Sequence, residues 1–203
     1  MTKFIWKTKG QTLLWLDKKV KKSRIPSSLI FKLSDWKQSS YPILKKITQR
    51  FKNNNIAIRS SSINEDTLKT SNAGVYESFL NISSKKKKLV AEKIHKVFES
   101  YGKKNNNDEV LIQEMIENIA YSGVIFTHEI KNKAPYYSIN YDDISGSSTT
   151  VTSGTSSYSN KTLYIHRGSL NGIRSERFSV LLKSIIEIEN LFNNNELDIE
   201  FVV

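Results

Sequence analysis

The sequence predicts an α+β protein that folds as two lobes. Helical periodicity dominates the first half of its 203 residues, and short strand-like runs dominate the second half. Its 38% apolar residues are enough to bury one or two ordinary cores. The polar stretch 102–108 between the two patterns is a candidate linker. We therefore expect an N-terminal α+β lobe over residues 1–104 and a strand-rich second lobe over residues 105–203.

In the first lobe, the spacing of the leucines from Leu13 onward predicts a helix that continues to Val20. A strand follows at 29–31. A second helix is predicted at 44–51, and an asparagine triplet ends it, because Asn tolerates left-handed backbone geometry. The remaining elements predicted here are a buried strand at 56–58, an extended stretch at 75–82 and a helix at 89–101.

The second lobe begins with a succession of apolar or alternating runs that are typical of strands. A long amphipathic helix follows, and the chain then returns to an extended pattern. A Ser/Thr/Gly-rich stretch at 145–160 interrupts the strands as a loop. The strands are predicted at 110–115, 121–128, 136–141, 163–166 and 197–203, and the helix at 176–192.

The chain is basic, with 31 Lys and Arg against 20 Asp and Glu and a net charge of +11. Its densest basic runs, Lys18–Arg24 and Lys85–Lys88, lie at predicted helix ends. Neither run contains interleaved aromatic residues, so both are interpreted as solvated helix ends, and no specific nucleic-acid partner is expected. A third and weaker hypothesis nevertheless keeps a basic nucleic-acid-associated protein open, which the salt dependence of binding would test.

The composition also excludes several classes of site. With no cysteine, the chain has no disulfide, thiolate metal site or cysteine nucleophile. No apolar run reaches the roughly 20 residues that cross a bilayer, and Lys3, Lys7 and Lys9 interrupt the N-terminus. We therefore expect a cytoplasmic protein with no membrane partner.

The segment with the most chemical information starts at the buried strand 56–58. The strand delivers Arg59 at its end, and the hydroxyls of Ser60, Ser61 and Ser62 follow at once. A guanidinium can clamp a phosphate through two parallel hydrogen bonds, and serine hydroxyls with loop amides can complete an anion site. An arginine that only caps a strand beside an ordinary Ser-rich loop fits the same residues.

This segment resembles part of a known family. Together with Glu65-Asp66 and the stretch 73–81, it is similar to the N-terminal nucleotide-binding domain of the phosphoenolpyruvate synthase and pyruvate phosphate dikinase family. Three further matches follow the family's order along the chain. They are Lys9-Gly10 with the leucines 13–16 and Arg24-Ile25-Pro26, the strand pair at 110–116 and 122–127, and Asp198-Ile199-Glu200-Phe201.

The resemblance implies an ATP-grasp-like fold in which two lobes hold ATP and Mg²⁺ in a cleft. It assigns phosphate contacts to Lys9 and Arg59, next to the serines of the motif. It assigns the metal and the nucleotide to Asp198 and Glu200. It also implies an adenine hinge formed by Gln113, Glu114, Met115 and Ile116.

The residues themselves agree with the metal assignment. Asp198 and Glu200 are two positions apart on a predicted strand, so their carboxylates share one face, and hard oxygen ligands suit phosphate-bound Mg²⁺. An ordinary solvated strand face fits the same two residues. The ordered motifs lead us to expect that Arg59 and this acidic pair face one cleft.

Two departures from the family matter. Thr149 stands where the family has a glutamate in a glycine-rich loop that corresponds to Gly146–Gly154, which puts a metal or phosphate role there in question. The sequence also stops at Val203, just after the acidic strand, whereas the family continues with a strand that carries a glutamine and an arginine. We therefore expect the nucleotide site to be incomplete at its C-terminal edge.

No catalytic residue is expected in this chain. In the family, phosphoryl passes from ATP to a histidine on a separate carrier domain and then to an acceptor in another domain. None of His95, His128 and His166 lies in a context that resembles the carrier motif. The carrier and acceptor domains are thus expected as partners, in the same chain or a separate one.

The leading hypothesis is the ATP-binding portion of a phosphoenolpyruvate-synthase-like kinase with an unknown acceptor, either part of a longer protein or a truncated or split gene product. In isolation it is expected to show little or no kinase activity. The alternative is a non-catalytic nucleotide- or partner-binding module derived from that family.

Overall fold

The structure of the protein, a computed structural model, describes residues 7–52, 54–62, 66–67, 70–71, 76–102, 105–129, 132–146 and 160–203. The chain divides into two compact units. In the described part, the first unit consists of residues 7–19 and Arg24–Met115, and the second of Val20–Ser23 and Ile116–Val203. Both units combine helices with antiparallel sheet, which confirms the α+β class.

The first unit is built on a four-stranded antiparallel sheet with the strand order β1-β6-β2-β5. Its two central strands, β2 and β6, are buried along most of their length because both faces of the sheet are covered there. The strands are β1 (Ser28–Lys32), β2 (Asn55–Ser61), β5 (Ser78–Ser83) and β6 (Glu109–Glu114), with a short ladder of β3 (Asp66–Thr67) and β4 (Thr70–Ser71).

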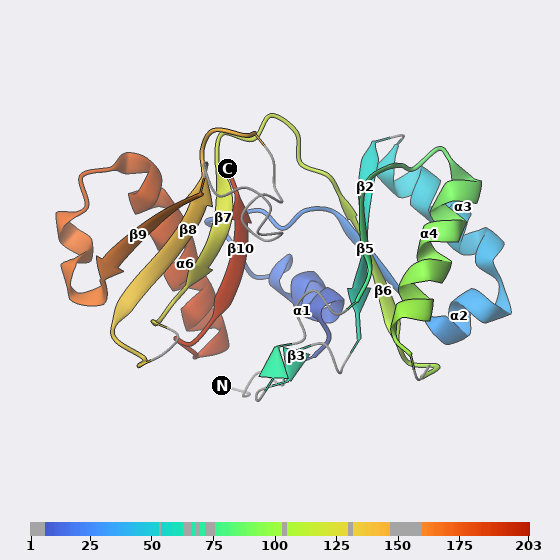
Figure 1. The fold of residues 1–203 in the computed structure, drawn as a ribbon, viewed down its shortest axis with the longest axis horizontal. Coiled ribbons are helices and arrows are strands. Elements are labelled where there is room, and N and C mark those ends of the chain that lie inside the picture. The colour runs from blue at the N-terminus through green and yellow to red at the C-terminus, as the bar shows by residue number, and fades with distance from the viewer. Residues whose placement is uncertain are drawn as a thin grey trace. The chain divides into compact units, whose positions relative to one another are not determined.

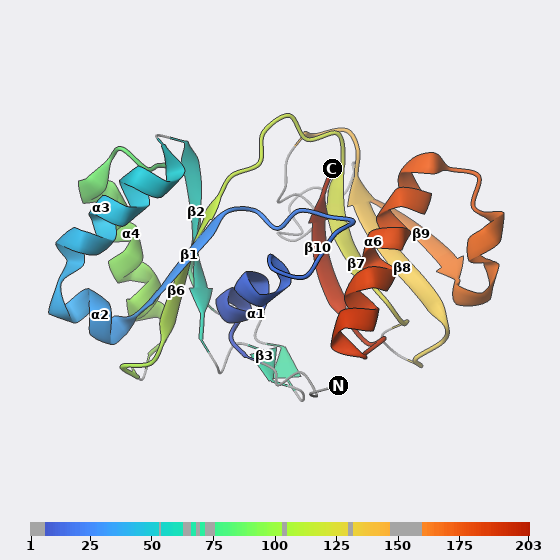
Figure 2. The same cartoon turned by 180° about the vertical axis from the view of Figure 1, so that it is seen from behind.

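Three helices, α2 (Leu33–Gln38), α3 (Ser40–Phe51) and α4 (Lys87–Ser100), cover one face of this sheet, as Figure 1 shows. Figure 2 shows α1 (Lys9–Leu16) on the opposite face. Successive side chains of a strand point to opposite faces of the sheet, so every second side chain faces the three helices. The core between that face and the helices includes Ile56, Ile58, Val110 and Ile112 from the strands and Ile47, Ile94, Val97 and Phe98 from the helices.

The structure corrects two expectations about helices. The first helix ends at Leu16 and does not continue to Val20, because the chain passes into the second unit at Val20–Ser23. There the amide groups of Lys21 and Lys22 donate to the carboxylate of Glu187 at 2.9–3.1 Å, so this stretch makes its hydrogen bonds outside any helix. Helix α2 was not predicted, because its single pair of buried residues, Leu33 and Trp36, is too short a pattern to recognise.

The boundary between the units also differs from the sequence-based expectation of 104/105. Strand β6 pairs with β1 on one side and with β2 on the other, so residues 105–115 belong to the first unit. The physical reason is that strand pairing is a long-range property, and a linker-like composition in front of β6 does not reveal which sheet β6 joins.

The second unit is a four-stranded antiparallel sheet with the strand order β10-β7-β8-β9, covered on one face by α6. Figure 2 shows α6 in front of this sheet, and Figure 1 shows the opposite face. Residues Ile125, Tyr137, Ile139, Leu181, Leu182 and Ile185 form the centre of the core. The elements are β7 (Ser122–Phe126), β8 (Tyr136–Asp142), β9 (Asn160–His166), the 3-10 helix η1 (Arg167–Gly172), α6 (Glu176–Phe192) and β10 (Asp198–Val202).

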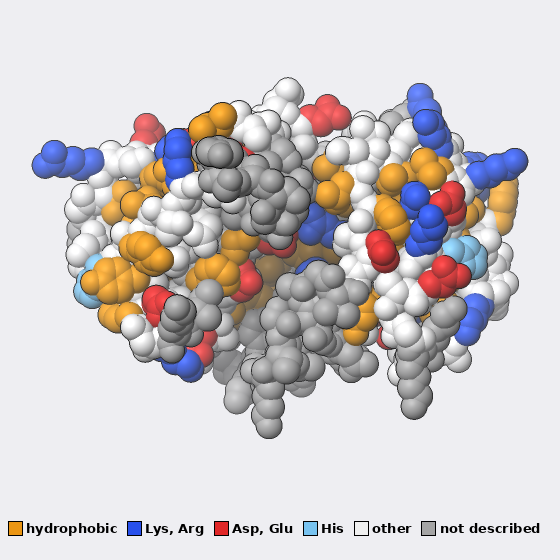
Figure 3. Space-filling view, viewed as in Figure 1, with side chains coloured by type: hydrophobic (Ala, Val, Ile, Leu, Met, Phe, Trp, Pro, Cys, Tyr) orange, Lys and Arg blue, Asp and Glu red, His pale blue; other side chains and the backbone are white. Residues whose placement is uncertain are grey.

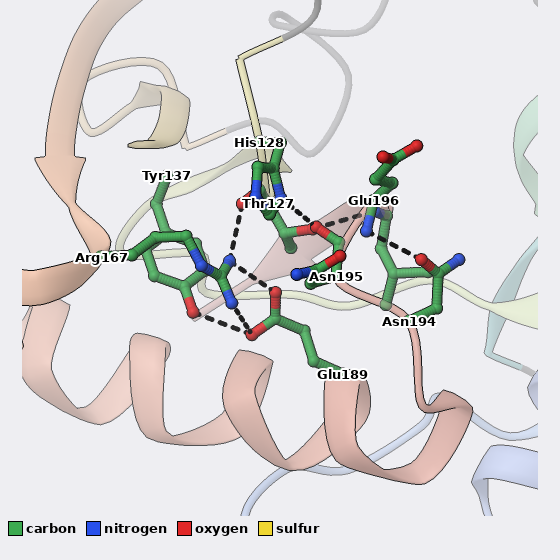
Figure 4. A network of polar contacts seen from close by, with 9 residues as sticks. Thr127, His128, Tyr137, Arg167, Glu189, Asn194, Asn195 and Glu196 are labelled. Atoms are coloured by element: carbon green, nitrogen blue, oxygen red, sulfur yellow. Dashed lines mark hydrogen bonds and ion pairs between the residues drawn. The ribbon is translucent and has the colours of Figure 1, made fainter. Parts of the chain in front are cut away.

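A buried polar network fastens α6 to the sheet of the second unit (Figure 4). The guanidinium of Arg167 donates to both carboxylate oxygens of Glu189, at 2.7 and 3.2 Å, and to the Thr127 carbonyl oxygen at 2.7 Å. The Tyr137 hydroxyl donates to Glu189 Oε2 at 2.8 Å, and the Arg167 guanidinium lies 4.5 Å from the centre of the Tyr137 ring. Burial, followed by the neighbouring Glu189 carboxylate, raises the pKa of Tyr137 well above its ordinary value, so this hydroxyl remains a donor.

Helices long and apolar enough to cross a membrane do not occur among the described residues.

We expect Gly123→Ala to destabilise the second unit by about 3 kcal/mol, at the upper end of the usual cost of overpacking. A Cβ at Gly123 would lie 2.0 Å from the Asn140 carbonyl oxygen and 2.9 Å from Tyr141 Cα. These are main-chain atoms of the paired strand β8, so they can move only if the β7–β8 ladder opens. Urea unfolding followed by circular dichroism measures the loss. Gly172→Ala, where a Cβ meets no atom within 4 Å, is the matched control, and equal stability of the two variants would contradict the prediction.

Candidate functional site

The candidate site lies on the face of the first sheet that carries α1. Paired residues of antiparallel strands project to the same face. Arg59 of β2 pairs with Leu111 of β6, and Ser61 pairs with Glu109. These side chains project away from the core that contains Ile58 and the helices α2–α4. The face thus presents the half-buried Arg59 between apolar and acidic neighbours.

The N-terminus of α1 is held against this face by hydrogen bonds over long sequence distances. The Gly10 amide donates to Ser61 Oγ at 2.9 Å. The Thr8 hydroxyl donates to Glu109 Oε2 at 2.6 Å and accepts from the Gln11 amide at 3.3 Å, and Gln11 Nε2 donates to Glu109 Oε1 at 2.5 Å. Lys9, the first residue of α1, is thereby placed next to the end of β2.

The close packing around position 10 explains why this residue is glycine. A Cβ there would lie 2.4 Å from Ile30 Cγ2 and 3.0 Å from Ser61 Oγ. Only glycine therefore lets α1 approach β1 and β2 this closely. The Lys9-Gly10 pair that the sequence singled out is thus a docking point of α1 on the sheet.

The end of β2 is fixed by a second set of contacts. The Tyr101 hydroxyl accepts from the Ser61 amide at 2.9 Å and donates to the Glu109 carbonyl oxygen at 2.5 Å. Ser62 Oγ donates to Asp108 Oδ1 at 3.1 Å. These residues are all buried, so the strand end beside Arg59 is rigidly held.

The structure refines the roles assigned to the two serines. Ser61 is 0% exposed, and its hydroxyl oxygen accepts from Gly10. Ser60 is also buried, and it pairs with Val110, so alternation along β2 places its side chain on the helix-covered face, opposite to that of Arg59. Sequence spacing alone did not separate the two faces, because the strand was predicted to end at Ile58, whereas β2 continues to Ser61.

The predicted hinge segment lies at the end of β6. Its residues Gln113, Glu114, Met115 and Ile116 are all half-buried. The Glu114 amide donates to the Ser27 carbonyl and the Met115 amide to the Asn55 carbonyl, both at 3.0 Å. The Glu114 carboxylate forms an ion pair with Arg24 at 2.8 Å.

The acidic pair lies on β10 in the second unit. Asp198 and Glu200 are both exposed, whereas Ile199 and Phe201 pack into the core with α6. The two carboxylates therefore share the face that α6 does not cover, as their spacing predicted. Among the described residues there is no cluster of three or more His, Asp or Glu side chains that could hold a metal alone. Two hard carboxylate ligands fit a Mg²⁺ ion that takes its other oxygens from phosphate and water.

The structure brings together Lys9, Arg59 and Ser61 in the first unit, and Asp198 and Glu200 in the second. The convergence of these two sets on one nucleotide stays a prediction. Glu65, Ala73, Gly74, Thr149 and Gly154, which the family comparison also used, lie outside the described residues.

Of the three histidines, His95 and His166 are exposed and His128 is half-buried. The ring of His95 packs edge-on against Trp36, and that of His166 against Tyr136, with centroid distances of 5.8 and 5.1 Å. His166 Nδ1 also accepts from the Gly168 amide at 3.2 Å, and His128 Nδ1 contacts the Asn195 carbonyl oxygen.

Sequence reasoning missed the residues that build the frame of the site: Thr8, Gln11, Tyr101 and Glu109. Thr8 carried a signal, since a threonine directly before a helix is a common N-cap. The sequence around Glu109 and Tyr101 gave no such signal. A local pattern does not show that a charged residue at the start of a strand, or a tyrosine after a helix, contacts a distant segment.

An arginine near the end of a strand and beside a docked helix N-terminus is an arrangement that can bind an anion, and here it occurs in an α+β chain. The particular family follows from a comparison with family models. Residues 18–159, more than half of the chain, match the family described as pyruvate phosphate dikinase, AMP/ATP-binding domain. The chain belongs to this family, which confirms the resemblance to the nucleotide-binding domain of phosphoenolpyruvate synthase and pyruvate phosphate dikinase. No curated protein matches the chain.

The family match covers part of the candidate site. It includes Arg59, both serines and the segment 113–116, whereas Lys9, Asp198 and Glu200 lie outside the matched residues. For these three positions the assignment depends on the motifs of the sequence and on their placement in the structure.

We expect Gly10→Ala to displace the N-terminus of α1 and to lower the stability of the first unit by about 1–3 kcal/mol, since the added methyl must push Ile30 aside. Urea unfolding followed by tryptophan fluorescence measures the effect, because Trp15 lies in α1. Gly102→Ala is an unsuitable control because its φ is +65°, whereas Gly172→Ala in the second unit is open. An unchanged midpoint would show that α1 is not docked as described.

Proposed function

We propose that this chain is the ATP-binding portion of a phosphoenolpyruvate-synthase-like kinase. In this proposal, phosphoryl passes from ATP to a histidine of a separate carrier domain and then to an acceptor that the chain does not identify. The observation that carries the proposal is that two distant motifs, Lys9-Gly10 and Arg59-Ser60-Ser61, meet at one strand end of a domain of the AMP/ATP-binding family.

Lys9 and Arg59 are proposed to bind the phosphates of ATP. Phosphoryl transfer needs positioning and charge neutralisation more than covalent chemistry from the protein, so two cations on a rigid frame suit it. The frame supplies the rigidity, because the hydrogen bonds of Tyr101 and Glu109 fix the end of β2. The buried hydroxyl of Ser61 then serves the site by positioning α1.

The segment 113–116 is proposed to bind adenine through main-chain groups. The amides of Glu114 and Met115 already donate to the carbonyl oxygens of Ser27 and Asn55, so these two amides are not available to the base. Because the proposed contacts are main-chain groups, substitutions of the side chains in this segment should have little effect on adenine binding.

Asp198 and Glu200 are proposed to hold Mg²⁺, which neutralises charge on the phosphates when bound. The second hypothesis, a non-catalytic nucleotide-binding module, is favoured by one sequence feature, Thr149 in place of the family's glutamate. Phosphoryl transfer to an added carrier domain, measured with labelled ATP, distinguishes the two.

The proposal is tested by titrating ATP calorimetrically with Mg²⁺ and with a chelator. We expect the wild-type chain to bind ATP at least about ten-fold more tightly with Mg²⁺. The double variant Asp198→Asn with Glu200→Gln should lose this difference, because amides replace the two anionic ligands at exposed positions where folding is little affected.

The matched control is Glu117→Gln with Glu176→Gln, which removes the same charge from exposed positions elsewhere in the second unit. If the control loses the Mg²⁺ dependence to the same extent, or if the wild-type chain does not bind ATP, the proposed metal site is wrong.

A further inference from the structure

The first unit carries a basic surface that the nucleotide site does not use. It consists of six exposed lysines and one tyrosine on helices α3 and α4 and the turn before α4. We call it the α3/α4 basic surface. Its members are Tyr41, Lys45, Lys52, Lys85, Lys86, Lys87 and Lys88.

These residues form one continuous patch although they come from two segments. Tyr41, Lys45, Thr48 and Lys52 follow each other at spacings of four, three and four residues, which places them along one side of α3. The Thr48 hydroxyl donates to the Ser84 carbonyl oxygen at 3.3 Å, so the turn before α4 lies against this side. Lys87 Nζ lies 6.0 Å from the centre of the Tyr41 ring. Figure 3 shows Lys and Arg side chains projecting from the part of the molecule that α3 and α4 occupy in Figure 1.

The patch is electrostatically unbalanced within the unit itself. In the described part of the chain, none of its six lysines forms an ion pair, and the first turn of α4 has no acidic residue. Glu92, the nearest acidic residue along α4, is paired with Lys93 and Lys96. Four consecutive lysines therefore lie at the positive end of a helix, an arrangement that costs stability in the absence of an anion.

Tyr41 adds a flat apolar group to this charged surface. Its side chain is 67% exposed, whereas the apolar side of α3 is buried through Ile43, Ile47 and Phe51. The surface therefore has no apolar stripe that could enter a membrane. An acidic polypeptide would pair with the lysines but offers no flat group to stack on the exposed ring. A chain of phosphates that also carries flat bases satisfies both features.

We propose that the α3/α4 basic surface binds single-stranded nucleic acid without sequence preference, with lysines on the phosphates and a base stacked on Tyr41. The sequence kept nucleic-acid binding open only as a weaker hypothesis and gave it no surface, because Tyr41 and the run 85–88 are far apart in the chain and only the fold places the ring beside the lysines. The surface is separate from the residues proposed to bind ATP, and the proposal does not depend on them.

The test measures fluorescence anisotropy of a labelled thymidine oligonucleotide of about 15 residues with the full chain at about 50 and 200 mM salt. We expect Lys45→Gln, Lys87→Gln and Lys88→Gln together to weaken binding at low salt by ten-fold or more and to reduce the salt slope by about 2, since each phosphate contact contributes roughly 0.7. The control triple, Lys18→Gln, Lys19→Gln and Lys183→Gln, removes the same charge from exposed lysines elsewhere.

Variants of Tyr41 distinguish the contribution of base stacking to the affinity from that of charge. Tyr41→Leu should weaken binding about ten-fold at both salt concentrations, and Tyr41→Trp should restore it, because stacking on an aromatic ring is only weakly dependent on salt. Equal losses in the two lysine triples would show that affinity follows net charge, and would overturn the proposal. An unchanged affinity of Tyr41→Leu, with polyglutamate competing as well as the oligonucleotide, would also overturn it in favour of an acidic polypeptide.

Discussion

Replacing Glu189 by alanine is expected to lower the free energy of unfolding of the second unit by about 3–5 kcal/mol. Its side chain is only 7% exposed and accepts from Arg167 and Tyr137. Without the carboxylate, a largely buried guanidinium and a buried hydroxyl lose their partner at once. The loss of one member of a buried pair costs more than the pair contributes, because the remaining charge stays desolvated.

Hydrogen exchange of the amides in β8 and α6 measures this effect within the second unit alone. The comparison is Lys133→Ala, which removes an ion pair with Glu196 whose side chains are 68% and 52% exposed, and which should cost less than about 1 kcal/mol. The double variant Arg167→Met with Glu189→Leu should recover part of the stability, since it leaves no unpaired charge, whereas the Tyr137 hydroxyl still lacks its acceptor. If Glu189→Ala and Lys133→Ala have similar effects, the network does not fasten α6 to the sheet.

Replacing Arg59 by alanine is expected to weaken Mg·ATP binding by about ten-fold or more. A charge-assisted hydrogen bond to phosphate contributes about 1.5–3 kcal/mol, and an alanine side chain has no group that could replace it. Arg59→Lys should give an intermediate affinity, because lysine keeps the charge and loses the planar two-pronged geometry. Calorimetric titration at two salt concentrations measures both variants.

Lys86→Ala is the control for Arg59, since Lys86 belongs to the α3/α4 basic surface and should change ATP affinity only slightly. Equal losses for Arg59→Ala and Lys86→Ala, both vanishing at high salt, would mean that ATP only samples basic surface. The proposed phosphate role of Arg59 would then be wrong, whereas the nucleic-acid proposal would be unaffected, because it is measured with other variants.

Periodic patterns in the sequence predicted the longer elements well. Helix α6 spans Glu176–Phe192 as predicted, and the buried residues of α4 recur at helical spacing. The strands β7, β8 and β10 also lie at the predicted stretches 121–128, 136–141 and 197–203. Each of these elements has a buried face long enough to produce a periodic pattern of apolar residues, so the local sequence was sufficient to predict it.

Predictions from the local sequence failed where an element is short, or where contacts with a distant segment determine its end or its place in a sheet. Helix α2 has only six residues and a single buried pair, Leu33 and Trp36. The end of α1 and the assignment of β6 to the first unit depend on contacts with segments far along the chain. No local pattern encodes such contacts.

The sequence by itself determined the α+β class, the family and the shared face of Asp198 and Glu200. These follow from composition, ordered motifs and the two-residue period of a strand, all of which are local properties. Only the tertiary structure decided that Ser61 holds Gly10 of α1, that Glu109 is buried against the same helix and that Ser60 faces the other way. The reason is that strand pairing and helix docking join residues about 50 to 100 positions apart, as with Gly10 and Ser61 or Thr8 and Glu109. The buried polar groups of these residues form their hydrogen bonds only when the distant segments come together.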